Sequence, residues 1–587
     1  MEAGPEPEIP GTGGTDGPGS PDSADRTDRA DRTDSTDSTD STGRVPHPAW
    51  ARRLPRGRRT RWPLAAGLAG VLLATGALAL AGGRTPQPPQ TRAAPSGGAV
   101  ARMAAGPAVE ASAPRTIPAV RSYEKGAGRG WSPLPGTRVV APKDGPLADE
   151  GRRLARELDV PLAHTAARDG DVALALDADV PGGREAYRIA VSAGGGARIT
   201  GASDAGVFYG TRTLLQARRS GGGLPPGVIE DRPDRAQRGF ALDLARKFFP
   251  REWIEARMYE LAALKYNQLG LHLSDDQAFR IESTTHPEIV SDPHLTKADV
   301  RALVALGREL HIEVIPEIDS PGHLGAVIAA HPSLGLRDGA GRPVRGAVNV
   351  IDPAAGRLLD ELLAEYAPLF PARNWNLGGD EYAPLMSADP EARFPQLAAA
   401  ARERYGERGR IQDLATAWLN DRAAVLEERG KRIQQWNDGI YPGGVVRTPG
   451  DRQVEYWTGK EYGARPPQDY LAEGRNLVNL NDEFLYYVLG EPNDFAYPTG
   501  QRIYEQWTPA VLRGTTPVPA SVAGPDRILG ARLAVWCDLA GAQSTAQVAA
   551  GVRLPLAALA QKVWDPRRPV LTWAEFRALA GVVAPAR

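Results

Sequence analysis

The chain has 587 residues, a formal net charge of −1 and a single cysteine, Cys537. The near-zero charge gives no general attraction to nucleic acids or anionic membranes, and one thiol can form neither an internal disulfide nor a cysteine-based metal centre. The chain also has 12 Trp but only 10 Phe, a surplus that indicates either large cores or flat apolar platforms with a polar edge.

The N-terminal 60 residues are rich in Gly, Pro, Ser, Thr and Asp, and few of their side chains are apolar. The stretch from Asp25 to Thr42 is of low complexity. Such a segment cannot bury enough apolar surface to offset its chain entropy. Residues 1–60 are therefore predicted to form a disordered tail.

An uncharged stretch from Leu64 to Ala81 follows a cluster of arginines. Its length fits a marginal transmembrane helix and also a signal-peptide core, so residues 61–84 are predicted to be a signal peptide or an uncleaved signal anchor. A buried core helix is the alternative. Because basic residues precede it, we expect the rest of the chain to be extracellular, secreted or anchored to the outer face of the membrane. Residues 85–116, rich in Pro, Ala and Gly, are predicted to be a linker.

Globular sequence begins near Ile117. Apolar residues recur at helical spacing over 147–158, and Val172, Leu174 and Leu176 alternate as in a strand. Two further predicted strands, 187–191 and 197–200, flank three glycines and are typical of a hairpin; a helix is predicted over 205–216. Residues 117–232 are thus predicted to form a small α+β domain.

From Arg238 onward, short apolar strands alternate with amphipathic helices. The predicted strands are 239–244, 268–273, 313–318, 374–377, 432–436, 453–456, 476–480 and 533–536. The predicted helices are 251–265, 297–310, 356–370 and 411–430. This pattern predicts a (β/α)₈ TIM barrel of the α/β class over 233–587. A doubly wound sheet is the alternative, but it usually carries a glycine-rich loop after its first strand, where this chain has Ala245, Arg246 and Lys247.

Functional side chains of a barrel lie at the C-terminal ends of its strands. The polar and aromatic residues there are Arg246, Asp275, Asp276, Asp319, His323, Asp380, Glu381, Trp436, Trp457, Asn481, Asp482, Trp536 and Asp538. The set contains no nucleophilic Ser or Cys arrangement and no phosphate cradle. It also lacks a His or Cys ligand cluster, so we expect no metal and no cofactor.

The densest signal is the segment from Asn376 to Tyr382, in which Gly378 and Gly379 precede Asp380 and Glu381. Two glycines permit a sharp turn at a strand end. Neighbouring residues of an extended segment point in different directions, so one carboxylate is expected to orient a substrate while the other transfers a proton. A glycine turn with a solvated acid pair is the alternative.

Four segments together resemble glycoside hydrolase family 20, the β-N-acetylhexosaminidase family. They are RGFALDLARKFFP from Arg238, HLSDDQ from His272, PEIDSPGH from Pro316 and GGDE from Gly378. The stretch 201–216 resembles the small α+β domain that precedes the family's barrel. The resemblance covers about residues 117 to 580.

The resemblance implies substrate-assisted catalysis, in which the substrate's 2-acetamido oxygen attacks the anomeric carbon and forms an oxazolinium. It implies that Glu381 is the general acid and later the base, with a raised pKa. It implies that Asp380 orients the acetamido N–H and stabilises the oxazolinium charge. The expected activity is exo-acting release of terminal N-acetylglucosamine or N-acetylgalactosamine, with retention, from oligosaccharides or glycoconjugates.

The remaining site residues are implied one by one. Arg246 matches an arginine that binds sugar hydroxyls, although a salt bridge at the barrel rim is the alternative. Asp275 and His323 match a hydrogen-bond relay to the general acid. The aromatic wall of the pocket and the residue at the position of a common glutamate complete the set: Trp436, Trp457, Trp536 and Asp538.

Several positions depart from the family pattern. Asn376 stands where the family usually has His, Lys247 replaces a common His and Phe279 a common Trp. A strict alignment puts Phe484 at the family's acetamido-binding Tyr, and we expect Tyr486 to serve instead. These departures keep two alternatives open: a family 20 enzyme of another exo-specificity, such as disaccharide release, and a carbohydrate-binding protein without turnover.

Overall fold

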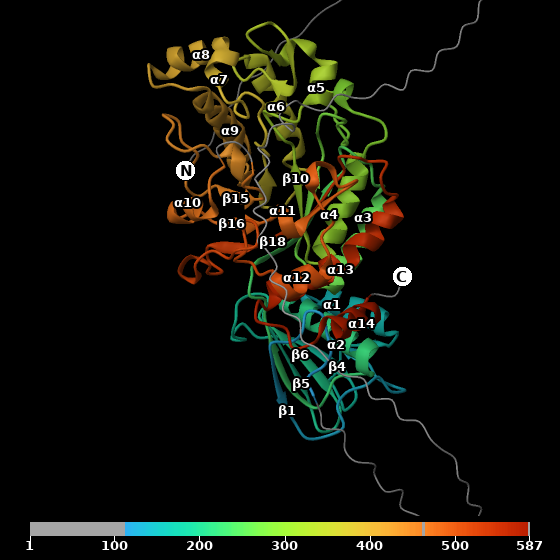
Figure 1. Ribbon diagram of the computed structural model, residues 1–587. Helices are drawn as coiled ribbons and strands as arrows, with labels where there is room; N and C mark the ends of the chain where they lie inside the picture. Colours follow the sequence, from blue (N-terminus) through green and yellow to red (C-terminus); the bar gives the residue numbers. More distant parts are fainter. Residues whose placement is uncertain (1–111, 461–463, 585–587) are drawn as a thin grey trace, which may run out of the picture. The chain divides into compact units, whose positions relative to one another are not determined.

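The computed structural model describes residues 112–460 and 464–584 (Figure 1). The predicted disordered tail, the signal or anchor segment and most of the predicted linker lie outside these described residues. Within them, no helix combines the length and apolar character needed to cross a membrane.

The first part of the described chain forms a seven-stranded mixed sheet in the order β1-β7-β5-β6-β4-β2-β3. Its strands are β1 (Ser122–Lys125), β2 (Val139–Val140), β3 (Leu162–Ala163), β4 (Val172–Leu176), β5 (Tyr187–Val191), β6 (Ala197–Gly201) and β7 (Gly227–Asp231). The predicted hairpin is confirmed, because β5 and β6 pair antiparallel with Ile189 opposite Ile199. Two helices, α1 (Leu147–Leu158) and α2 (Asp204–Gly221), pack on this sheet.

The second part is the predicted barrel. Eight parallel strands follow one another around it: β8 (Gln237–Asp243), β9 (Gln268–His272), β10 (Glu313–Glu317), β13 (Asn374–Asn376), β14 (Arg432–Trp436), β15 (Gln453–Tyr456), β16 (Leu477–Asn479) and β18 (Ile528–Trp536). Because β18 pairs with both β16 and β8, the sheet closes on itself. The doubly wound alternative, an open sheet, is therefore wrong. A short strand, β17 (Tyr486–Val488), also pairs with β18.

The four predicted barrel helices are present as α3 (Arg251–Ala263), α4 (Lys297–Glu309), α6 (Pro353–Tyr366) and α9 (Ile411–Glu427). The sequence did not predict α5 (Gly325–Ala330), α7 (Pro390–Arg393), α8 (Pro395–Tyr405), α10 (Pro467–Ala472), α11 (Asp482–Leu485), α12 (Gly500–Gln506), α13 (Thr545–Trp564) and α14 (Trp573–Val583). It also missed a small hairpin of β11 (Gly335–Arg337) and β12 (Pro343–Val348). The long α13 contains Pro555, which disrupts the helical signal because proline usually ends a helix.

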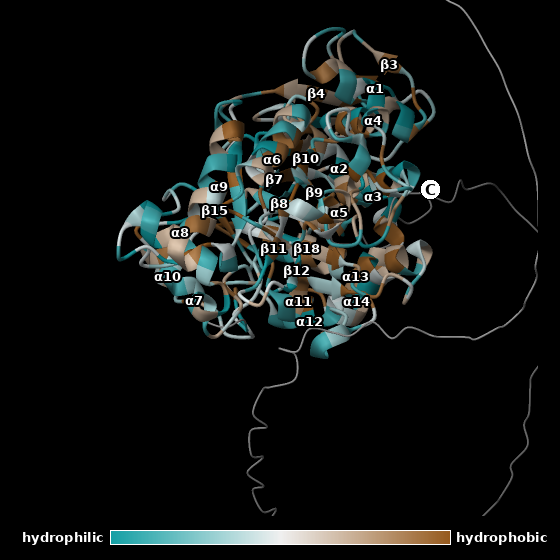
Figure 2. Cartoon of the chain, turned by 90° about the horizontal axis from the view of Figure 1, so that it is seen from above, coloured by the Kyte–Doolittle hydropathy of each residue, from teal (hydrophilic) through white to brown (hydrophobic). Residues whose placement is uncertain are grey.

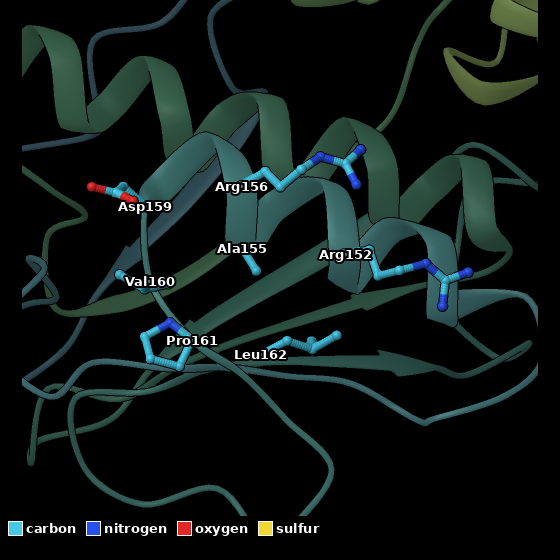
Figure 3. Close-up of a pocket in the computed structure, with 7 residues that line it drawn as sticks. All are labelled: Arg152, Ala155, Arg156, Asp159, Val160, Pro161 and Leu162. Carbon is cyan, nitrogen blue, oxygen red and sulfur yellow. The ribbon is translucent and has the colours of Figure 1, made fainter.

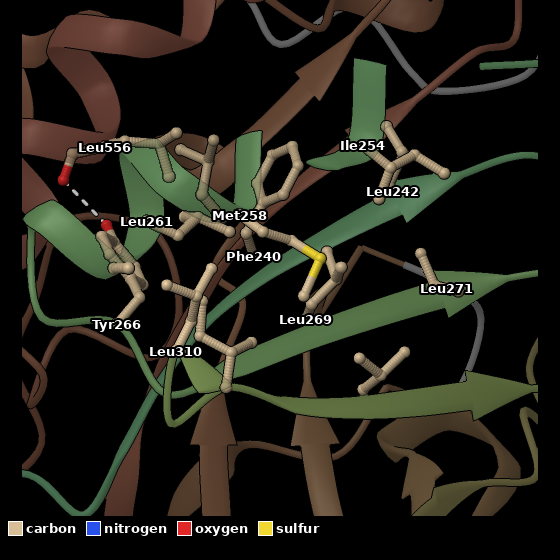
Figure 4. Packing of buried hydrophobic residues seen from close by; sticks show 14 of the residues in the cluster. Phe240, Leu242, Ile254, Met258, Leu261, Tyr266, Leu269, Leu271, Leu310 and Leu556 are labelled. Carbon is tan, nitrogen blue, oxygen red and sulfur yellow. Dashed lines mark hydrogen bonds between the residues drawn. The ribbon is translucent and has the colours of Figure 1, made fainter. Parts of the chain in front are cut away.

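Apolar side chains fill the layer between the strands and the outer helices. Phe240 of β8 and Leu269 of β9 pack with Met258 of α3, and Tyr266 donates a hydrogen bond to the carbonyl of Leu556 at 2.8 Å (Figure 4). The helices around the barrel carry both hydrophobic and hydrophilic segments (Figure 2), as expected for helices with one buried face.

The inside of the barrel is polar at its centre. Arg532 and Glu455 form an ion pair at 2.7 Å, and the side chains of both are at most 2% exposed. A Cβ at Gly239 would come within 2.8 Å of the Arg532 side chain, so the glycine leaves room for the arginine. The small sheet and the barrel are joined on the opposite side from the strand C-termini, since Arg238 at the start of β8 pairs with Glu185 at 2.7 Å.

Candidate active site

The acid pair lies on a left-handed turn directly after β13. Gly378, Gly379 and Glu381 all have positive φ values, of 69°, 97° and 48°. A Cβ at Gly378 would overlap Asp319, and the N–H of Gly379 donates to Asp319 Oδ1 at 2.8 Å. The left-handed conformation of Glu381 is costly for a residue other than glycine. The turn therefore fixes the backbone from which Asp380 and Glu381 project.

His323 lies beside both members of the pair. Its Nε2 lies 3.5 Å from Asp380 Oδ2 and 3.6 Å from Glu381 Oε2, while its Nδ1 lies 3.3 Å from Asp275 Oδ1. His323 also has a positive φ, of 54°. The structure thus brings together Asp275, His323 and the acid pair, as the relay prediction requires.

These groups shift one another's pKa values. Burial raises the pKa of Glu381, Asp380 raises it further and His323 lowers it, with a raised pKa as the net result. Burial alone would lower the pKa of His323, but Asp275 and Asp380 raise it well above its usual value. Glu381 can therefore keep its proton at higher pH than an ordinary glutamate, which suits a general acid.

The side chain of Asp319 lies next to that of Asp380. Burial, together with the neighbouring Asp380, raises the pKa of Asp319 well above its usual value. The oxygens Asp319 Oδ2 and Asp380 Oδ1 are both buried, and neither accepts a hydrogen bond from an N–H or O–H group of the described residues. A protonated Asp319 can donate to Asp380, since two facing carboxyls cannot both ionise cheaply. Asp319 therefore supports Asp380 as well as the glycine turn.

Arg246 lies between two buried carboxylates. Its guanidinium is 2.6 Å from Asp275 Oδ2 and 3.1 Å from Asp243 Oδ2, and it lies 5.5 Å from the ring centre of Trp536. Burial lowers the pKa of Arg246, but Asp275, Asp243 and Asp538 raise it well above the usual value. Arg246 thus makes the alternative salt bridges and also borders the aromatic wall. Asp538 is exposed beside it.

Four aromatic rings form the wall. Trp457 and Tyr486 stack at 5.5 Å with an interplanar angle of 3°, and Trp536 lies 5.8 Å from Tyr486 and 5.9 Å from Trp436. Phe484, by contrast, is buried under Arg502, whose guanidinium lies 4.2 Å from the ring. Tyr486 rather than Phe484 therefore faces the other rings.

Sequence reasoning missed two acidic residues of this site. Asp438 follows Trp436 and accepts hydrogen bonds from the N–H of Glu381 at 3.0 Å and from Trp457 Nε1 at 2.9 Å. Glu317 accepts from Trp436 Nε1 at 2.8 Å and lies 3.1 Å from His272 Nδ1. Glu317 is the last residue of β10, and Asp438 lies just after β14. This position at a strand end was the only feature of the sequence that could have identified them.

His272 continues this chain to the relay, because its Nε2 lies 3.0 Å from Asp275 Oδ2. Contacts therefore run from the indole of Trp436 through Glu317 and His272 to Asp275. The aromatic wall and the acid pair are thus parts of one network.

Asn376 does not contact the acid pair through its side chain. Its Oδ1 accepts from the N–H of Gly378 at 2.8 Å, and its Nδ2 donates to Glu455 Oε2 at 3.2 Å. It stabilises the start of the glycine turn. Lys247, the second departure, donates to the carbonyl of Ala540 at 2.7 Å.

A separate shallow depression lies in the small domain, at the end of α1 and the start of β3 (Figure 3). It is lined by Arg152, Ala155, Arg156, Asp159, Val160, Pro161 and Leu162. None of the predicted site residues lines it, so it is not part of the site described above.

The catalytic-domain profile of glycosyl hydrolase family 20 matches residues 236–567, and the profile of the family's domain 2 matches residues 113–232. A lacto-N-biosidase of Bifidobacterium bifidum is 28% identical over 481 residues, which cover 80% of this chain and 41% of that protein. A β-hexosaminidase of Akkermansia muciniphila is 28% identical over 429 residues, which cover 67% of this chain and 82% of that protein.

Among solved structures, the family 20 β-N-acetylhexosaminidase of Streptomyces coelicolor A3(2) is similar with a TM-score of 0.63. At 24% identity the match covers 81% of this chain and 96% of that one, and it shows the shared fold. Together the two profiles span both described parts of the chain. The protein is therefore a glycoside hydrolase that belongs to glycosyl hydrolase family 20.

Proposed function

We propose that the protein removes terminal N-acetylhexosamine residues from glycans by acetamido-assisted hydrolysis with retention. One observation carries this proposal: Asp380 and Glu381 are neighbours in the sequence, and both lie beside Nε2 of His323, at 3.5 and 3.6 Å. A retaining enzyme with a protein nucleophile needs two carboxyls about 5–5.5 Å apart on opposite sides of the bond. Neighbouring residues of one turn cannot easily act as equivalent partners on opposite faces of a bond, so we infer that the substrate supplies the nucleophile.

Each side chain then has one task. Glu381 gives its proton to the leaving oxygen while the acetamido oxygen attacks the anomeric carbon. Asp380, supported by Asp319 and His323, accepts the acetamido N–H and stabilises the positive oxazolinium. Glu381 afterwards takes a proton from water, which attacks the anomeric carbon from the face that the leaving group vacated and opens the oxazolinium. Two displacements restore the original configuration.

The aromatic wall supplies the binding surface. Trp457 and Trp536, which are partly exposed, offer faces for sugar C–H bonds, and the buried Trp436 packs against Trp536. In this proposal the Tyr486 hydroxyl donates to the acetamido oxygen. Tyr486 lies near Asp380, whose charge together with burial raises the pKa of the tyrosine well above its usual value. The hydroxyl therefore remains a donor throughout the working range of pH.

A second candidate is release of a disaccharide. It is favoured by the similarity to the lacto-N-biosidase, which extends over 80% of this chain. Asp538 agrees with it, since an aspartate reaches less far across the pocket rim than the common glutamate. Turnover-deficient carbohydrate binding is not favoured, because both carboxylates and the relay are in place.

The test compares 4-nitrophenyl glycosides of N-acetyl-β-glucosamine, N-acetyl-β-galactosamine, β-glucose and lacto-N-biose. Cleavage of the first two and not of the glucoside supports the proposal, since glucose lacks the nucleophile. Cleavage of the lacto-N-bioside alone supports the second candidate. Equal cleavage of the glucoside, or full activity of Glu381→Gln, would overturn the acetamido mechanism.

We further propose that the enzyme acts outside the cytoplasmic membrane, on the basis of the apolar stretch from Leu64 to Ala81. Cell fractionation with N-terminal sequencing of the mature protein tests this. Enzyme found only in the cytoplasm would contradict the proposal, and an intact N-terminus in the membrane fraction would identify an anchor.

A further inference from the structure

We propose that His286, Glu288 and His331 form a binding site for a divalent transition-metal ion, with Zn²⁺ as the best fit. One potential donor atom of each residue lies within 4.8 Å of those of the other two. None of the three takes part in the acid pair, the relay or the aromatic wall. The sequence did not predict this group, because Glu288 and His331 are 43 positions apart.

Two matching turns build the group. His286 directly precedes the 3₁₀ turn η2 (Pro287–Ile289), and His331 directly precedes the 3₁₀ turn η3 (Pro332–Leu334). The two histidines have nearly the same backbone angles, φ −135° and ψ 65° against φ −125° and ψ 70°. Their rings lie 6.3 Å apart at 89° to one another. Proline fixes the start of each turn, so both imidazoles are presented by rigid backbone.

Glu288 lies between the rings. Its Oε1 is 3.1 Å from His286 Nδ1 and 2.8 Å from His331 Nε2. Bonds of about 2.0–2.2 Å in a tetrahedral zinc site separate ligand atoms by about 3.3–3.4 Å. A rotation that widens the present contacts by about 0.5 Å would therefore admit the ion. The side chain of Glu288 is 43% exposed, which leaves access for the ion and for a water ligand.

Glu361 contacts the second ring nitrogen of His286. Its Oε2 lies 2.9 Å from His286 Nε2, the ring nitrogen that faces away from Glu288. Metal-binding histidines usually donate their second N–H to a carboxylate in this way. A cation on Nδ1 would leave the contact between Nε2 and Glu361 in place.

The donor set selects the ion. Two imidazoles with one carboxylate suit Zn²⁺, Cu²⁺ or Ni²⁺, whereas Ca²⁺ and Mg²⁺ prefer sets made only of oxygen. The site also joins two loops that matter for catalysis. His286 and Glu288 belong to the β9–α4 loop that contains Asp275, and His331 follows α5 in the loop that contains His323. The ion would tie together the loops that hold the relay.

The test uses the full chain without a histidine tag, freed of metal with a chelator and titrated calorimetrically with Zn²⁺. We expect one equivalent to bind and the melting temperature to rise. Glu288→Ala and His331→Gln should each weaken binding at least tenfold, and Glu361→Gln about tenfold to a hundredfold. His164→Ala, which removes an imidazole in the small domain, is the matched control and should bind as the wild type does. The metal-free variants should melt within a few degrees of the metal-free wild type.

A second arm separates this site from the acid pair, because Asp319, His323 and Asp380 also lie close enough together to hold an ion. Binding that survives His331→Gln but is lost in His323→Asn would overturn the proposal. Binding of less than a tenth of an equivalent would overturn it as well. Stoichiometry is measured without substrate, so the outcome is independent of the proposed hydrolysis.

Discussion

The indole N–H of Trp457 donates to Asp438 Oδ1 at 2.9 Å, and the other oxygen of the same carboxylate accepts the backbone N–H of Glu381 at 3.0 Å. One side chain thus positions a ring of the aromatic wall and the backbone of Glu381, the proposed general acid. Asp438 acts through these neighbours and is a positioning residue.

Asp438→Asn should lower kcat by about tenfold to a hundredfold, a loss of about 1.4–2.7 kcal/mol. An amide can keep only one of the two acceptor oxygens, so either Trp457 or Glu381 loses its support. Asp438→Ala should lose more. The measurement is steady-state kinetics with the N-acetylglucosaminide, and the exposed Asp421→Asn is the control. Wild-type kcat in Asp438→Asn would contradict the positioning role.

Asp319→Asn should keep most of the activity, within about fivefold of the wild type, whereas Asp319→Ala should lose at least a hundredfold. An asparagine resembles the protonated acid, since it can accept from the N–H of Gly379 and donate to Asp380. Kinetics and melting temperatures of both variants check this. If the asparagine and alanine variants are equally impaired, Asp319 is needed as a carboxylate. The interpretation that a protonated Asp319 donates to Asp380 is then wrong.

His323→Asn should move the alkaline limb of the pH profile of kcat/KM to higher pH. The proposed mechanism requires protonated Glu381, so activity should fall as pH rises through the raised pKa of that residue. The charge of His323 lowers this pKa, and its removal lets the pKa rise. The profile is recorded from pH 4 to 9, with His294→Asn as the control. A limb that stays in place or moves to lower pH would disprove the coupling.

Tyr486→Phe should lower kcat by about tenfold to a hundredfold with a smaller change in KM, because in the proposed mechanism the hydroxyl acts on the acetamido oxygen as it becomes the nucleophile. Tyr487→Phe is the matched control. Its hydroxyl donates to Gln543 at 3.1 Å, outside the wall. Equal effects of the two variants would show that Tyr486 contributes only packing.

The free energy of unfolding of the barrel should fall as pH rises through the range in which Glu455 loses its proton. Burial raises its pKa from 4.5 to about 7, against the opposing effect of Arg532. A group whose pKa is higher in the folded state stabilises the fold fully below pH 4.5, and this contribution is lost as pH rises to 7. The change is at most about 3 kcal/mol. Urea unfolding at several pH values should show this slope in the wild type, and a much flatter one in Glu455→Gln.

Much of the fold could be predicted from the sequence, for reasons seen in single elements. Barrel strands such as β9 and β10 are short, largely apolar runs, and helices such as α4 and α6 have one apolar face. Both patterns can be recognised in the sequence without knowing which elements pack together. Helix α13 was missed because Pro555 interrupts the pattern, and the β11–β12 hairpin because β11 has only three residues and β12 begins with a proline and contains Gly346.

The candidate site divides in the same way. Asp380, Glu381 and His323 could be found because they lie in motifs at strand ends. Asp438, Glu317 and the His286 group could not, since their importance depends on contacts with residues more than 40 positions away. The choice between Phe484 and Tyr486 also needed coordinates, because it depends on which ring faces the wall.

Arg532, Glu455 and Gly239 at the centre of the barrel constrain how the sequence can diverge. Replacing Glu455 alone leaves the buried guanidinium of Arg532 without its carboxyl partner, replacing Arg532 alone leaves buried Glu455 without its cationic partner, and any side chain at Gly239 collides with the arginine. A change to an apolar barrel interior would therefore have to pass through one of these destabilised single replacements. In an alignment of close relatives, these three positions should therefore change together or not at all.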